Sequence, residues 1–217
     1  MRELGYTGLE TSCREIEKHF ERGGEVGSQI RRMGMRLYGV EMEDGPYDAQ
    51  TGLPPSERID RIAAGVAKIG AERLILTGEV APKVEDKLAA LKSVEAYCRR
   101  LGLRLAYRNQ LADVAAELPL LMKKSRDVEF LVDWGHIREA KIDMLPLFQK
   151  YRDAISGMHF RDFHGEQQVP LGQGDVDYGP LAKAMLKADW SGWVIAAEER
   201  EASAVTARSY LRKLLGV

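Results

Sequence analysis

Short apolar runs alternate with longer amphipathic segments along the whole chain. The runs are rich in Val, Ile, Leu, Tyr or Met, as the strands of a buried parallel sheet are. We predict seven strands, over residues 6–11, 35–42, 73–77, 103–107, 128–133, 155–160 and 193–197. The amphipathic segments predict helices over residues 56–69, 84–100, 111–124, 144–152, 178–188 and 203–215.

This alternation repeats about every 30 residues, which predicts βαβ units and a parallel sheet. A doubly wound nucleotide-binding sheet is disfavoured, because no Gly-x-Gly-x-x-Gly or P-loop pattern follows a strand. Polar residues instead occupy the predicted strand ends: Glu10, Glu41, Thr77, Arg108, Asp133, His159 and Glu198. Active sites of (β/α) barrels gather there. We therefore predict an α/β TIM-type barrel, with residues 1–217 as a single domain.

Four segments of the C-terminal half carry distinctive motifs. They read Asp-Trp-Gly-His at 133–136, His-Phe-Arg-Asp at 159–162, Gly-Gln-Gly-Asp-Val-Asp-Tyr at 172–178, and a strand at 192–198 that ends in glutamate. Their order and spacing resemble the xylose isomerase-like TIM barrel superfamily, which includes sugar phosphate isomerases/epimerases and inosose dehydratases. That family has eight strands, and the segment at residues 4–10 resembles its second, so the first β-α unit is expected to be lacking.

The resemblance implies a metal site formed by Asp133, His159 and Glu198. One imidazole with two carboxylates suits Mn²⁺, Co²⁺, Mg²⁺ or Zn²⁺. In the relatives such a metal polarises a substrate carbonyl or hydroxyl while a glutamate moves the neighbouring proton. We accordingly expect a metal-assisted isomerase, epimerase or dehydratase of a small sugar or polyol, with Glu198 as the general base.

Arg108 departs from the family pattern, because it stands where a fourth metal ligand is usual. It has three interpretations: it replaces the metal charge by pairing with Asp133 or Glu198, it turns outward to bind an anionic substrate group, or the site is degenerate. The metal site is weakened in each case. His136 is then the best remaining candidate for a second acid or base.

Three further residues are candidates for substrate binding. Arg161 replaces a lysine of the family and either holds an anionic substrate group or pairs with Asp162. Glu41 and Glu10 are expected on the same face of the barrel as the site. They either bind substrate or are ordinary residues of the barrel rim. Asp133, His159 and Glu198 could each have a purely structural role. The presence of all three in the expected order favours a functional site.

Composition narrows the class of protein. The 32 basic and 33 acidic residues nearly cancel, which disfavours a nucleic-acid surface, and no apolar run approaches the roughly 20 residues of a membrane span. Two cysteines, Cys13 and Cys98, are expected to be reduced thiols of a cytoplasmic protein.

Two alternative functions stay open. The first is an altered or inactive barrel that binds a ligand or a partner, and its open strand edges would favour a homodimer. The second is a DNA-repair nuclease related to endonuclease IV, which is disfavoured because that chemistry needs many histidines and this chain has four.

Overall fold

The structure, a computed structural model, describes residues 4–43, 56–77, 83–110, 117–197 and 201–216. The chain divides into two compact units. Unit 1 comprises Met1–Arg108 and Leu120–Glu129, and unit 2 comprises Asn109–Pro119 and Phe130–Val217.

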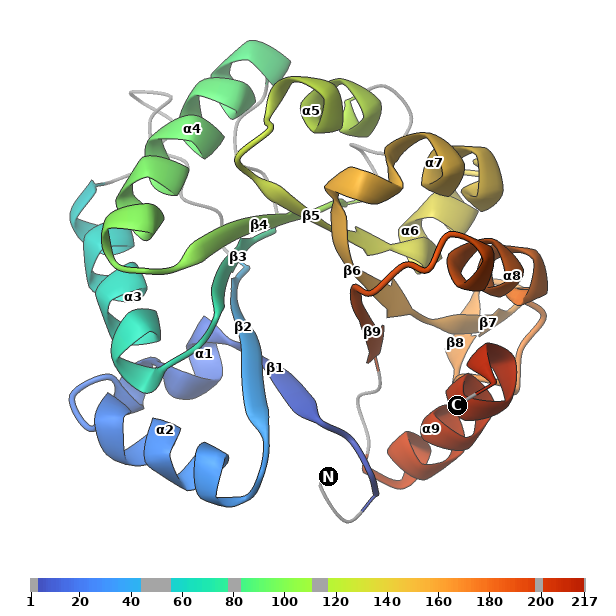
Figure 1. Cartoon of the computed structure of the whole chain (residues 1–217), viewed down its shortest axis with the longest axis horizontal. Helices are drawn as coiled ribbons and strands as arrows, with labels where there is room; N and C mark the ends of the chain where they lie inside the picture. The colour runs from blue at the N-terminus through green and yellow to red at the C-terminus, as the bar shows by residue number, and fades with distance from the viewer. Residues whose placement is uncertain (1–3, 44–55, 78–82, 111–116, 198–200, 217) are drawn as a thin grey trace. The chain divides into compact units, whose positions relative to one another are not determined.

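Unit 1 is built on four parallel strands. They are β1 (Gly8–Ser12), β2 (Arg36–Met42), β3 (Arg73–Leu76) and β4 (Arg104–Arg108), each paired with the next. The helical elements of this part of the chain are α1 (Cys13–Ile16), η1 (Glu17–His19), α2 (Gly23–Arg32), α3 (Ser56–Ile69), α4 (Val84–Arg100) and α5 (Leu118–Lys124). Helices α2, α3 and α4 lie along one side of these strands (Figure 1).

The amphipathic pattern of α3 determines how it packs. Ile59, Ile62, Val66 and Ile69 recur at helical spacing, and all four are buried. Helix α2 approaches the end of α3 at Gly27, where a Cβ atom would lie only 1.9 Å from the Ile69 carbonyl oxygen. Glycine is therefore required at this helix contact.

The amino ends of the unit 1 strands carry a network of paired charges, which we call the amino-end network. Arg73 donates to Glu72 at 2.9 Å and to Glu129 at 2.5 Å. Arg104 bridges the same two carboxylates at 3.0 and 2.9 Å, and Arg36 donates to Glu72 at 2.7 Å. Three guanidinium groups and two carboxylates thus tie the starts of neighbouring strands together.

Unit 2 contains three parallel strands and a separate hairpin. Strands β5 (Glu129–Asp133), β6 (Ile155–Phe160) and β9 (Trp193–Ala196) pair in that order, and β7 (Asp162–His164) pairs antiparallel with β8 (Gln167–Val169). The helical elements are α6 (Trp134–Glu139), α7 (Met144–Tyr151), η3 (Arg152–Ala154), α8 (Gly179–Lys187) and α9 (Glu201–Leu215). The chain passes directly from β6 into the hairpin, which places the hairpin beside the end of that strand (Figure 1).

All seven predicted strands are present within about two residues of their expected bounds. The short helices α2 and α6 and the hairpin were not predicted. The helix expected at 111–124 is described only as Leu118–Lys124, because residues 111–116 lie outside the described part of the chain. Within the described ranges, no helix combines the length and apolar character needed to cross a bilayer.

Candidate functional site

Asp133 is the fixed centre of the candidate site. It ends β5 and caps α6, and its side chain is fully buried. Oδ1 accepts a hydrogen bond from the Gly135 amide at 3.0 Å, and Oδ2 accepts one from Nε of Arg161 at 3.0 Å. The two oxygens therefore serve a helix cap and an ion pair at once.

Asn109 holds the backbone of Asp133 in place. Its Oδ1 accepts from the Asp133 amide at 2.8 Å, and its Nδ2 donates to the Asp133 carbonyl at 3.4 Å. Asn109 is fully buried, so both bonds satisfy groups that water does not reach. No sequence motif marks Asn109 as part of the site.

His159 lies next to Asp133, as predicted. Strands β5 and β6 pair these two residues directly, and Nδ1 of His159 is 3.9 Å from Oδ2 of Asp133. This distance is beyond hydrogen-bond range. The two side chains, both almost fully buried, are therefore neighbours at the carboxyl ends of their strands. Asp133, His159 and Arg161 are referred to below as the Asp133 cluster.

The hydrogen bond of His136 indicates which of its ring nitrogens carries the proton. Its Nδ1 is 3.1 Å from the backbone carbonyl of Asn109. Because a carbonyl can only accept, Nδ1 carries the proton, and in the neutral ring Nε2 then has a free lone pair. A ring in this tautomer can accept a proton at Nε2, and the role of His136 as an acid or base stays a prediction.

Arg161 pairs with Asp133, so the expected alternative of a pair with Asp162 is wrong. Its Nη1 donates to Oε1 of Gln168 at 3.2 Å, and Gln168 donates in turn to the Ala197 carbonyl at 3.4 Å. The hairpin residue Gln168 thus connects Arg161 to the end of β9. Its place in the site had no signal in the sequence, because the hairpin itself was not predicted.

Asp162 has a structural role that explains the glycine-rich loop. Its carboxylate accepts four backbone amides, from Phe163, Gly172, Gly174 and Val176, at 2.9 to 3.2 Å. A Cβ atom on Gly174 would lie 2.3 Å from Oδ1 of Asp162. The loop therefore wraps around a carboxylate of its own chain, which accounts for its glycines without a phosphate.

Tyr178 fixes the backbone of Arg161 from the end of this loop. Its hydroxyl donates to the Arg161 carbonyl at 2.6 Å. Burial is the largest cause that raises the pKa of Tyr178, so the phenol stays protonated and remains a donor.

The remaining predicted residues with a described position belong to unit 1. Arg108, at the end of β4, forms an ion pair with Glu41 of β2, and its Nη2 is 3.5 Å from the Thr77 hydroxyl. Glu10 lies in β1 and is partly buried. Arg108 therefore has a carboxylate partner, Glu41, that was not predicted from the sequence. Glu198, the predicted base and metal ligand, lies outside the described residues.

A divalent cation does not fit the Asp133 cluster as it is arranged. Oδ2 of Asp133, which faces His159, already holds the Arg161 guanidinium. A dication about 4 Å from a guanidinium is repelled by roughly 8 kcal/mol at an effective dielectric near 20. Within the described ranges, no three His, Cys, Asp or Glu side chains are placed to hold a metal ion.

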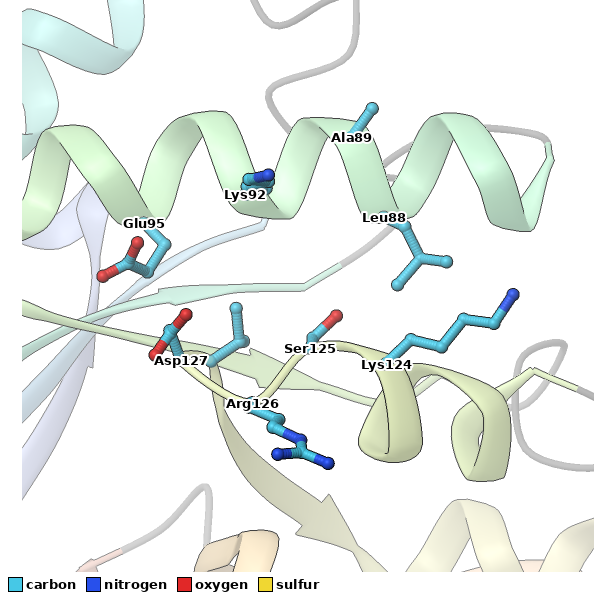
Figure 2. Close-up of a pocket in the computed structure, with 9 residues that line it drawn as sticks. Leu88, Ala89, Lys92, Glu95, Lys124, Ser125, Arg126 and Asp127 are labelled. Carbon is cyan, nitrogen blue, oxygen red and sulfur yellow. The ribbon is translucent and has the colours of Figure 1, made fainter.

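A separate hollow of about 600 Å³ lies in unit 1, between α4 and the segment that joins α5 to β5. Figure 2 shows its lining side chains: Leu88, Ala89, Lys92 and Glu95 on α4, Lys124 at the end of α5, and Ser125, Arg126 and Asp127 on the segment. None of the predicted site residues belongs to it.

A family model described as xylose isomerase-like TIM barrel matches residues 1–214. The chain belongs to this family. The TIM-barrel fold expected from the sequence is therefore confirmed, with seven parallel strands in the described part of the chain.

Curated relatives of this family member are inosose dehydratases. The protein from Lacticaseibacillus casei is 25% identical over 140 residues, which cover 53% of this chain and 47% of the relative. The protein from Bacillus velezensis is 21% identical over 228 residues, which cover 94% and 68%. The chain spans about half the length of the first of these relatives.

Solved structures show the same fold. D-psicose 3-epimerase in the presence of D-fructose has a TM-score of 0.77 at 15% identity, covering 99% of this chain and 91% of that one. The 3-keto-D-glucoside 4-epimerase YcjR from E. coli has a TM-score of 0.71 at 18% identity, covering 100% and 91%. At these identities the similarity concerns the fold alone.

Proposed function

We propose that this chain acts on a small sugar or polyol as an isomerase, epimerase or dehydratase, by moving a proton next to a carbonyl or hydroxyl group. The observation that carries the proposal is the cluster of a buried carboxylate, an imidazole and a guanidinium at the carboxyl ends of β5 and β6. The (β/α) barrels place their chemistry at these strand ends. The names of the relatives, which are dehydratases and epimerases of sugar-like compounds, support the same class.

Arg161 is the group that binds the substrate oxygen. Its Nε and Nη1 bond Asp133 and Gln168, while Nη2 makes no bond to any residue within the described ranges. The side chain is 22% exposed, so these remaining N–H groups are accessible to a ligand. A guanidinium donates well to a carbonyl oxygen and stabilises the negative charge that forms there when a neighbouring proton leaves.

Proton transfer falls to His136 and Glu198. A base removes the proton from the carbon beside the carbonyl, and the electron pair of that C–H bond moves to the carbonyl oxygen as an enolate. Return of a proton to the opposite face of the same carbon gives the epimer. Return of the proton to the former carbonyl carbon gives the isomer, while the hydroxyl on the first carbon gives up its proton to the former carbonyl oxygen and becomes the new carbonyl. In dehydration the enolate instead expels a hydroxyl, which takes a proton and leaves as water. Glu198 is our proposed first base, and His136, with its free Nε2, is the second.

Solvent exchange tests this proposal without knowledge of the product. The full chain is incubated in D₂O with a panel of ketoses, aldoses and inososes, and deuterium at the carbon next to the carbonyl is followed by NMR. We expect exchange on at least one compound, and strong loss of that exchange in Glu198→Gln and His136→Asn. An absence of exchange across the panel, with ligand binding still detectable, would instead support the ligand-binding barrel.

A further inference from the structure

We infer that Arg161 takes the place of a divalent cation in this site, so that the chain holds its own positive charge beside Asp133 and does not bind a metal there. The inference concerns the site of the proposed function and rests on that proposal for the substrate oxygen. Its metal-binding part stands on the geometry of unit 2.

The guanidinium is held in place by several contacts. Nε lies 3.0 Å from Asp133 Oδ2, and Nη1 lies 3.2 Å from the amide oxygen of Gln168. The arginine stem passes so close to α6 that a Cβ on Gly135 would come within 3.0 Å of Cδ. With its backbone fixed by Tyr178, the side chain is restricted from both ends. A group restricted in this way acts as part of the site, because little conformational entropy is lost when a ligand binds.

The guanidinium lies beside Oδ2 of Asp133, the oxygen that faces His159, where its charge would repel a bound cation. Asp133 and His159 are the described residues that would hold a metal, and Oδ2 of Asp133 lies 3.9 Å from Nδ1 of His159. The guanidinium bonds that same Oδ2, whereas Oδ1 is committed to the Gly135 amide. A cation would therefore have to displace the arginine or accept its charge as a close neighbour.

The positive charge also serves the chemistry that a metal would otherwise provide. A metal polarises a carbonyl by drawing charge to its oxygen. The accessible N–H groups of Arg161 do so by hydrogen bonding, and the Asp133 carboxylate keeps the guanidinium oriented. We expect catalysis by this chain to persist in the presence of a chelator.

Metal titration by calorimetry tests the inference without any substrate. The full chain is stripped of metal by dialysis against a chelator and then titrated with Mn²⁺ and with Co²⁺. We expect the natural protein to show no saturable binding at Asp133, and Arg161→Gln to bind at least tenfold more tightly, because the competing charge is gone. Arg161→Gln combined with Asp133→Asn should lose the gained binding.

Two controls separate charge from shape. Arg161→Met removes the charge with a side chain of different shape and should gain metal affinity as Arg161→Gln does. Arg138→Gln removes a unit 2 arginine that donates to the Gly165 carbonyl and lies over the Phe163 ring, and it should leave metal affinity unchanged. Circular dichroism confirms that each variant is folded.

The inference is overturned if the natural protein binds one equivalent of Mn²⁺ or Co²⁺ and Asp133→Asn abolishes that binding. It is equally overturned if folded Arg161→Gln gains no affinity. Should Arg161→Gln not fold, the titration of the natural protein against Asp133→Asn still decides. Failure of the proposed function gives a different result, namely no deuterium exchange, and leaves the titration unaffected.

Discussion

Arg73 in unit 1 and Arg161 in unit 2 are both arginines held by carboxylates, and the two regions differ in what surrounds the guanidinium. Arg73 is 3% exposed, bonds two carboxylates, and lies with its Cζ 4.3 Å from the centre of the Tyr38 ring. Arg161 is 22% exposed, bonds one carboxylate and one amide, and retains N–H groups that no described residue uses. Arg73 is almost fully buried, whereas Arg161 is held in one orientation and remains partly accessible to solvent.

This difference is the physical reason for proposing a functional role for Arg161 and a stabilising role for Arg73. A guanidinium that is buried against carboxylates and a ring is closed to a ligand, and it contributes to stability through its partners. A guanidinium that is fixed by one carboxylate and left with open donors has paid its ordering cost before the ligand arrives. The two arginines should therefore respond oppositely to substitution, one in stability and the other in rate.

The largest expected effect on stability is that of Arg73→Gln. This change leaves Glu72 and Glu129 near each other with less compensating charge, and we expect the free energy of unfolding to fall by about 3 kcal/mol. Urea unfolding followed by circular dichroism measures it. The control is Arg22→Gln, which breaks an exposed pair with Glu25 and should cost less than about 0.5 kcal/mol. Equal effects of the two variants would contradict the structural role of Arg73.

The second prediction concerns rate. Arg161→Lys retains the charge but loses the planar fork that reaches Asp133, Gln168 and a ligand together. On a substrate identified by deuterium exchange, we expect kcat/KM to fall about 100-fold, as for the loss of one oriented donor in other enzymes. Arg73→Gln, assayed where it is folded, should keep a near-normal kcat. A loss of kcat in Arg73→Gln with a normal kcat/KM in Arg161→Lys would contradict the proposed roles of the two arginines.

A smaller effect is expected from Asn109→Ala, which removes the clamp on Asp133. The buried amide and carbonyl of Asp133 lose their partners, and we expect the free energy of unfolding to fall by about 2 kcal/mol. Because Asp133 then holds Arg161 less firmly, kcat should fall more than KM rises. Gln149→Ala, on the exposed face of α7, is the control and should change neither quantity.

The smallest effect concerns the thiols of unit 1. Burial is the largest cause that raises the pKa of both Cys13 and Cys98 to about 12, so at pH 8 each is almost entirely protonated and unreactive. We expect slow alkylation by iodoacetamide in the natural protein, measured by mass spectrometry. Arg73→Gln should accelerate labelling by making unit 1 easier to open, and Arg161→Lys should not. Rapid labelling of the natural protein would show that the thiols are accessible.

The sequence predicted the sheet more completely than the site. Buried parallel strands form nearly continuous apolar runs, so their positions can be identified from the sequence. The predicted bounds of β2 and β6 agree with the structure to within one residue. The carboxyl strand ends also directed attention to Asp133 and His159, which the structure places side by side.

The partners of these residues could not be predicted in the same way. Arg161 is closer in sequence to Asp162 than to Asp133, and only the pairing of β5 with β6 makes the more distant carboxylate its neighbour. Gln168 reaches Arg161 through a hairpin with two strands of three residues, too short for a period to be recognised. Asn109 acts through the backbone of another residue, which no side-chain motif reveals.

The hairpin β7–β8 is a place where the partner of Arg161 can be changed by engineering. It delivers Gln168 to the guanidinium from outside the parallel strands of unit 2, so its residues can be exchanged while the strand register is kept. A library at position 168 would vary the partner of Arg161 among acids, amides and apolar side chains. Selection from such a library for new sugar substrates would vary the hairpin and leave the parallel strands unchanged.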